Sequence, residues 1–140
     1  MRRFIYIHFL VAITLFSSCT IKGGALTFSQ NPIYFTGEKQ TAEVTSSVNK
    51  MDVYLLILDG ERYNEPQQGA FNGRDNVEDA SRAYSYSFSV EWLSFSYDND
   101  TGSARITVDT NTSGNTRTAE IRVSSGSYFG YLNIIQEPIE

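Results

Sequence analysis

Apolar and polar residues alternate along the C-terminal half of the chain with the period of two that is typical of β-strands. The clearest segment is YSYSFSVEW at residues 84–92, which has aromatic and aliphatic residues on one face and mainly serines on the other. ARITV at 104–108, TAEIRV at 118–123 and YFGYLNIIQ at 128–136 follow the same pattern. Segments rich in Asn, Asp and Gly separate them and indicate turns.

The N-terminal half gives weaker signals of the same kind. ALTFSQNPIYF (25–35) and TAEVTSSV (41–48) alternate, whereas DVYLLIL (52–58) is continuously apolar and predicts a central strand covered on both faces. Asp59-Gly60 then indicates a tight hairpin. Residues 64–79, rich in Asn, Gln, Gly and Asp, indicate a long surface loop. Together these patterns predict an all-β fold, an antiparallel β-sandwich of about seven to nine strands.

The inward positions of the predicted strands identify the expected core. Trp92 is its largest member, since a buried aromatic side chain between the sheets is typical of such sandwiches. The other residues expected in the core are Phe28, Phe35, Ile106, Val108, Ile121, Val123, Leu132 and Ile134.

The first 18 residues have the features of a secretory signal peptide. Arg2 and Arg3 precede an apolar run at residues 4–16, which is too short for the ~20-residue helix that crosses a bilayer. Two serines and then Cys19 follow, and this arrangement resembles the bacterial lipoprotein signal, with Phe16 where most such signals have leucine. The resemblance implies cleavage before Cys19, lipid attachment to its thiol, and residues 19–24 as a short leader. The alternative is an ordinary signal peptide followed by an incidental cysteine.

Charge and composition exclude several classes of function. Loss of Arg2 and Arg3 with the signal lowers the basic count from 11 to 9 against 16 acidic residues, a net charge of −7, which is unsuited to nucleic acid. His8, the single histidine, is lost too, so Ser-His, Cys-His and histidine-zinc chemistry are excluded. A carboxylate pair that hydrolyses glycosides and a calcium loop at DNDTG (98–102) are the remaining alternatives, but a solvated surface and a hairpin turn explain these acids better. We therefore expect no enzyme, no metal and no cofactor.

The C-terminal segment resembles the BACON domain, an immunoglobulin-like module common in envelope proteins of Bacteroidetes. The matching features are Trp92, a strand ending at Asp109, an Asn-rich turn at Asn111, RTAEIRV from Arg117, and a last strand ending at Gln136. LTFSQNPIYFTGE, from residue 26, is similar to the family's first strands. The resemblance implies an immunoglobulin-like domain over residues 25–140 with a long insertion at about 49–91. It also implies carbohydrate binding, which was proposed for the family, or a spacer role.

Several aromatic residues do not fit the predicted core. In the last strand the family pattern places Phe129, Tyr131 and Asn133 on the outer face, and we expect Tyr84 and Tyr86 to extend beyond the covered part of their strand. Exposed rings can stack on the apolar face of a sugar while neighbouring polar groups bind its hydroxyls. These five residues are the candidate glycan-binding residues. The alternative is that the insertion folds over the rings and makes them a satellite core.

We therefore expect a non-catalytic lipoprotein of the cell envelope, attached to the outer membrane on its surface or periplasmic side, that binds or is displayed on glycans. The alternative is a structural or adaptor module that contacts another envelope protein.

Overall fold

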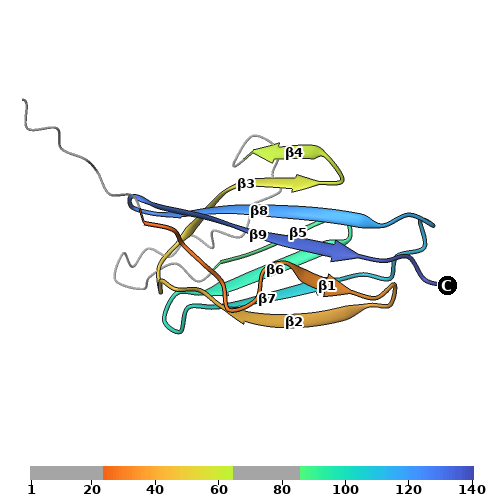
Figure 1. Ribbon diagram of the computed structural model, residues 1–140, viewed down its shortest axis with the longest axis horizontal. Helices are drawn as coiled ribbons and strands as arrows, with labels where there is room; N and C mark the ends of the chain where they lie inside the picture. The colour runs from red at the N-terminus through yellow and green to blue at the C-terminus, as the bar shows by residue number, and fades with distance from the viewer. Residues whose placement is uncertain (1–23, 65–85) are drawn as a thin grey trace, which may run out of the picture.

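The computed structural model describes residues 24–64 and 86–140, which form nine strands and no helix (Figure 1). The strands are β1 (Ile33–Phe35), β2 (Gln40–Thr45), β3 (Asp52–Leu58), β4 (Glu61–Asn64), β5 (Tyr86–Val90), β6 (Leu93–Asp98), β7 (Ser103–Val108), β8 (Arg117–Ser125) and β9 (Tyr128–Gln136). They form two packed sheets, one in the order β1-β9-β8-β3-β4 and the other in the order β2-β7-β6-β5. The predicted β-sandwich is confirmed. Within these ranges no helix could span a membrane.

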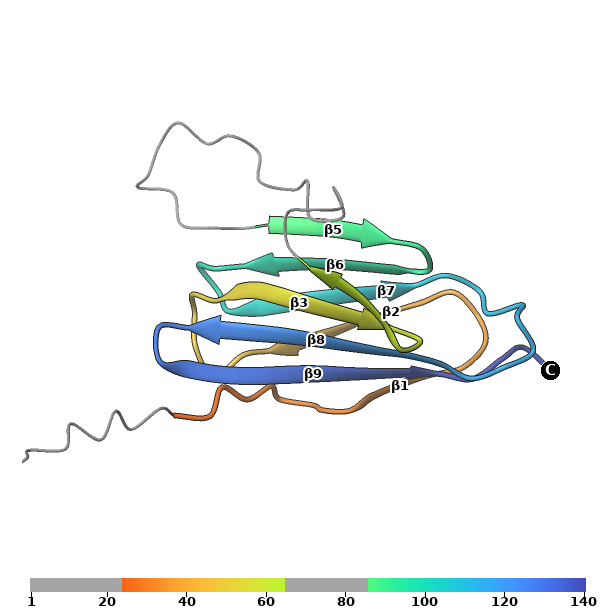
Figure 2. The ribbon, with the colours of Figure 1, turned by 90° about the horizontal axis from the view of Figure 1, so that it is seen from above.

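One strand pair departs from the expected antiparallel arrangement. β1 pairs with β9 in parallel, with Ile33 beside Ile134. Just before β1, the side chain of Asn31 prolongs this pairing: its Nδ2 donates to the carbonyl of Tyr131 at 2.8 Å, and its Oδ1 accepts from the N–H of Asn133 at 2.8 Å. A side-chain amide carries one donor and one acceptor, as a peptide group does, so it can replace a residue of the ladder. Figure 2 shows this first part of the chain running along β9.

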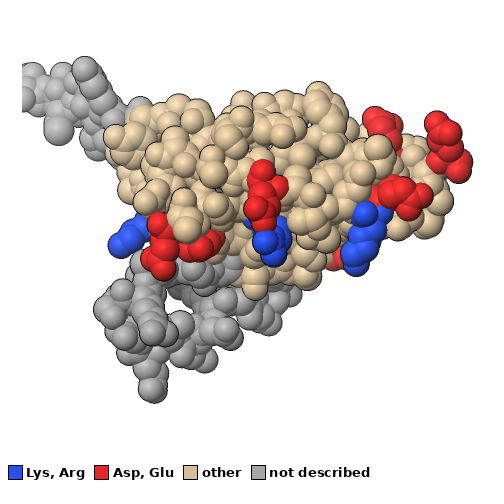
Figure 3. Space-filling model, turned by 90° about the horizontal axis from the view of Figure 1, so that it is seen from below, with Lys and Arg blue, Asp and Glu red and all other residues tan. Residues whose placement is uncertain are grey.

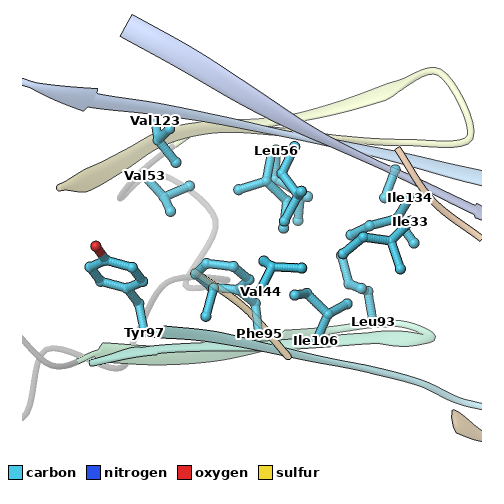
Figure 4. Packing of buried hydrophobic residues seen from close by; sticks show 14 of the residues in the cluster. Ile33, Val44, Val53, Leu56, Leu93, Phe95, Tyr97, Ile106, Val123 and Ile134 are labelled. Carbon is cyan, nitrogen blue, oxygen red and sulfur yellow. The ribbon is translucent and has the colours of Figure 1, made fainter. Parts of the chain in front are cut away.

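The core lies between the inner faces of the two sheets (Figure 4). The structure buries all nine residues expected there, and Ile106, Ile121 and Leu132 have no exposed surface. Phe88 and Phe95, from the paired strands β5 and β6, stack with their ring centroids 5.3 Å apart. The period of two explains this result, because every second residue of a half-buried strand must face the core.

Two tight hairpins illustrate what the sequence does and does not reveal. The Asp59-Gly60 hairpin is confirmed: both residues have positive φ, 47° and 89°, and Leu58 pairs with Glu61 across the turn. The predicted strand through Trp92, however, ends at Val90, and the chain turns at Glu91 and Trp92 to begin β6. Glu91 has a φ of 50°, which nothing in its residue type indicates.

The segment expected to be an insertion contributes strands to the sandwich itself. β3 lies between β8 and β4, and β5 pairs with β6. Leu56 and Leu58 of β3 belong to the core. A bulge between Val53 and Leu55 shifts the register of β3 against β8, and Tyr54 at this bulge is 41% exposed. Leu55 and Leu56, which follow it and point to opposite faces, are both buried, so β3 is covered on both faces there, as expected, but not at Tyr54. Apart from Asn64, the long loop expected at 64–79 lies outside the described residues.

The Asn-rich turn and the terminal glutamine have a structural role at one end of the sandwich. Gln136 is fully buried, and its Nε2 donates to the carbonyl of Asp109 at 2.8 Å. Asn111 is also fully buried; its Nδ2 donates to the carbonyl of Asn115 at 2.8 Å, and its Oδ1 accepts from the N–H of Ser113 at 3.1 Å. Asn111 Nδ2 also lies 3.4 Å from the carbonyl of Gln136, so the two buried amides join the turn to the end of the last strand through side-chain-to-backbone bonds.

A hydrogen bond between the two sheets gives a prediction about alkaline pH. The Tyr63 hydroxyl on β4 donates to the Glu91 carboxylate in the β5–β6 turn at 2.5 Å, and this bond, followed by burial, raises the pKa of Tyr63 to about 12. Because the folded pKa is raised, the bond stabilises the protein fully below the ordinary tyrosine pKa of about 10 and loses its effect as pH rises through about 12.

Tyr63→Phe is expected to lower the free energy of unfolding by about 1 kcal/mol at neutral pH. Urea denaturation of both proteins should show this difference shrinking between about pH 10 and pH 12. A difference that stays constant over that range would contradict the role assigned to the hydroxyl.

Candidate functional site

The outer face of the five-stranded sheet carries exposed aromatic side chains. Phe129 and Tyr131 on β9 are 59% and 54% exposed, whereas Leu132 and Ile134 of the same strand are fully buried. Successive residues of a strand point to opposite faces, so these two rings lie on the outer side. Figure 2 shows β9, β8 and β3 running next to one another in this sheet.

Tyr54 of β3 joins the two rings from across β8. Its ring is in edge-to-face contact with that of Phe129, with centroids 6.3 Å apart and an interplanar angle of 87°. Sequence reasoning did not select Tyr54, because a continuously apolar segment gives no outward face. The tyrosine hydroxyl could have indicated that this residue faces solvent, since Tyr54 is the only residue with a polar group in its side chain among the six after Asp52. We call Tyr54, Phe129 and Tyr131 the aromatic patch.

A charged pair on β8 lies among these rings. Arg122 is the cross-strand neighbour of Tyr131, and Glu120, two residues earlier on the same face, is the cross-strand neighbour of Asn133. The Nε of Arg122 donates to Oε1 of Glu120. This hydrogen bond, with the attraction between the two charges, raises the pKa of Arg122. The patch therefore combines flat rings with fixed donors and acceptors.

The other candidate residues do not all lie at this patch. Asn133 is half-buried beside it, and its backbone N–H is bonded to Asn31. Tyr86 begins β5 in the opposite sheet and is not part of the patch, and Tyr84 lies outside the described residues. Tyr34, which the sequence also did not select, is 68% exposed on β1 at the edge of the same sheet.

The described part of residues 49–91 does not cover the rings. β3 and β4 extend the same sheet sideways and β5 belongs to the other sheet, so none of the three lies over β9. The exposure of Phe129 and Tyr131 favours a surface patch over a satellite core. The remaining residues, 65–85, lie outside the described part of the chain.

The outer face of the four-stranded sheet has a different character. Its outward residues are small and hydroxylated, as in the pairs Thr41–Thr107 and Ser89–Ser94, whose oxygens are 2.9 and 2.7 Å apart. Arg105 and Glu43 form an ion pair on this side. Figure 3, seen from below, shows acidic and basic groups in small clusters on a mainly uncharged surface. The exposed large apolar side chains of the described residues include none from β2, β6 or β7.

The acidic segment DNDTG forms a hairpin turn between β6 and β7. Asp98 pairs with Ser103 across it, and the N–H of Asp100 donates to Oδ1 of Asp98 at 2.9 Å. Gly102 has a φ of 71°, a conformation that favours glycine. Among the residues in the described ranges, no three histidine, cysteine or acidic side chains are close enough together to hold a metal ion.

Comparisons with known proteins agree with this fold. The model of the BACON family, described as "Putative binding domain, N-terminal", matches residues 78–137, which confirms the resemblance over the C-terminal part of the chain. An NMR structure of a protein from Bacteroides thetaiotaomicron has a TM-score of 0.60 and 11% sequence identity, covering 84% of this chain and 91% of that one. At this identity the likeness concerns the fold alone. No curated protein matches the chain.

Proposed function

We propose that this chain, which carries a BACON-type binding domain over residues 78–137, is a non-catalytic lipoprotein of the cell envelope that binds glycans through the aromatic patch. The family is described as a binding domain rather than an enzyme family, which supports a binding role. The glycan ligand, the lipid anchor and the attachment to the outer membrane are parts of this proposal.

The exposure of the patch is the observation that carries the proposal. Three large rings from β3 and β9 face solvent at 41–59% exposure, although their burial would be favourable. Exposed aromatic clusters on a rigid sheet are typical of binding surfaces. A pyranose ring presents C–H groups on its faces and hydroxyls at its rim, so rings flanked by a charged pair match both parts of a sugar.

Affinity electrophoresis tests the proposal directly. The full chain, purified in detergent, is run through native gels that contain one polysaccharide each, from a panel of glucans, mannans, xylans and polyuronates. At least one polysaccharide should retard it relative to a gel without polysaccharide. Free migration through every gel would contradict glycan binding.

The same patch supports a second candidate function, contact with another envelope protein. Large exposed rings with an arginine among them are also common in protein interfaces. The edge strands of this sheet, β1 and β4, have only three and four residues, so contact through the patch is favoured over pairing along an edge. A protein captured from envelope extract whose binding is lost with the rings, combined with free migration in all gels, would favour this function.

We also propose that Cys19 is the attachment site of the lipid. Cys19→Ala should prevent acylation, so radiolabelled palmitate should label the parent protein and leave the variant unlabelled. Two acyl chains or more give stable anchoring, so the variant should also leave the membrane fraction or remain unprocessed. Ser18→Ala is the matched control and should keep the label. Palmitate incorporation into Cys19→Ala would refute the anchor.

A further inference from the structure

The charged pair inside the aromatic patch bears on which sugars the patch can take. Arg122 and Tyr131 are directly opposite each other on β8 and β9, with Cβ atoms about 5 Å apart in such pairs. Glu120 holds Arg122 through the Nε bond. Both side chains remain accessible, 42% for Arg122 and 32% for Glu120, so a ligand lying on the rings can reach them.

The pair offers hydrogen bonds without net charge. Arg122 uses Nε for Glu120 and has further N–H donors, and the carboxylate of Glu120 has further lone pairs to accept hydroxyl protons. A neutral sugar can satisfy both groups at once. A sugar carboxylate would have to displace Glu120 from Arg122 or lie against it as a like charge.

The nearest further carboxylate and the net charge of the chain also disfavour a ligand carboxylate. Asp52 at the start of β3 is exposed and pairs with Ser124 of β8, which in turn pairs with Phe129 of β9. A second carboxylate therefore lies two strands from Phe129 on the same face of the sheet. The whole chain is acidic, with a formal net charge of −5. Arg62 on β4 is a basic group that acts in the opposite direction, but it lies at the far edge of the sheet, separated from Glu120 by Ile57 of β3.

We propose that the aromatic patch selects neutral glycans over uronic-acid glycans, and that Glu120 enforces this selection by occupying Arg122. The inference rests on the proposed glycan binding, and it makes Glu120 a specificity-determining residue. Replacement of Glu120 by glutamine would keep the shape of the side chain and free the charge of Arg122 for a ligand carboxylate. A free arginine can bind a carboxylate through two parallel hydrogen bonds.

The test compares neutral glucan and xylan with polygalacturonate and alginate in the same gels, at low salt. The parent protein should be retarded by neutral polysaccharide and migrate freely through the polyuronates. Glu120→Gln should gain retardation by a polyuronate, with its dissociation constant falling at least tenfold, and added salt should remove the gain. Glu43→Gln is the matched control, because it frees Arg105 on the opposite face, where there is no aromatic patch, and it should gain nothing.

The outcomes separate the inference from the proposed function. Retardation of the parent by polyuronates as strong as by neutral polysaccharide would overturn the selection while leaving glycan binding in place. A Glu120→Gln protein with the melting temperature of the parent and no gain for polyuronates would overturn the role of Glu120. If Glu43→Gln gained as much retardation by polyuronates as Glu120→Gln, the change in net charge alone would explain the gain, and the role of Glu120 would also be overturned. A parent that binds no polysaccharide would overturn the proposed function and this inference together.

Discussion

Trp92→Ala is expected to lower the free energy of unfolding by about 3–5 kcal/mol, a large share of the 5–15 kcal/mol that is typical of domains. The indole is only 6% exposed, so its loss leaves a cavity in the core. Its Nε1 also donates to Oδ2 of Asp59 at 3.1 Å, and the guanidinium carbon of Arg117 lies 5.6 Å from the ring centroid. The residue thus connects the β5–β6 turn to the β3–β4 hairpin and to the start of β8.

Urea denaturation measures this effect, and Trp92→Phe is its matched control. Phenylalanine keeps much of the packing but removes the bond to Asp59, so it should cost clearly less than alanine. An unfolding midpoint of Trp92→Ala that equals that of the parent would contradict the buried position of the indole.

The second large effect is expected on binding. The double variant Phe129→Ala with Tyr131→Ala should abolish retardation by any glycan that retards the parent, because it removes two of the three rings of the patch. Both rings are more than half exposed, so each change should alter the free energy of unfolding by only about 0.5 kcal/mol. Native-gel retardation and a thermal melt of the same preparation give both values.

Tyr34→Ala is the matched control for the double variant. Tyr34 is the most exposed aromatic ring among the described residues, at 68%. It lies on the same sheet but opposite Ile135, several residues along β9 from Phe129. It should bind like the parent. A drop in stability of ~3 kcal/mol or more in the double variant would instead mean that the two rings belong to a covered cluster.

The parts of the fold that sequence reasoning predicted are those in which each strand shows its own faces. Ile106, Ile121 and Leu132 alternate with polar neighbours, so their inward position follows from the period of two alone. The turn at Glu91 was missed because the alternation continues through it and glutamate does not favour a positive φ. The parallel pairing of β1 with β9 was not predicted either, because it depends on contacts between segments far apart in the sequence.

The candidate site was predicted in part for the same reason. Phe129 and Tyr131 could be selected from one strand. Tyr54 could not, because it meets Phe129 only when β3 and β9 flank β8, and because the bulge after Val53 sets which way β3 faces. The bond between Glu120 and Arg122 joins two residues on the same face of β8, so their proximity could be predicted from one strand. Their position among the aromatic rings could not, because it depends on β8 lying between β3 and β9.

A backbone NMR titration tests the central claim, glycan binding at the aromatic patch, most directly. The isotope-labelled protein is titrated with a neutral oligosaccharide cut from the polysaccharide that retards it most. The largest amide shifts should lie at Tyr54, Arg122, Phe129 and Tyr131, with little change in β2, β6 and β7. Shifts confined to those three strands of the opposite sheet, with none at the aromatic patch, would contradict the account.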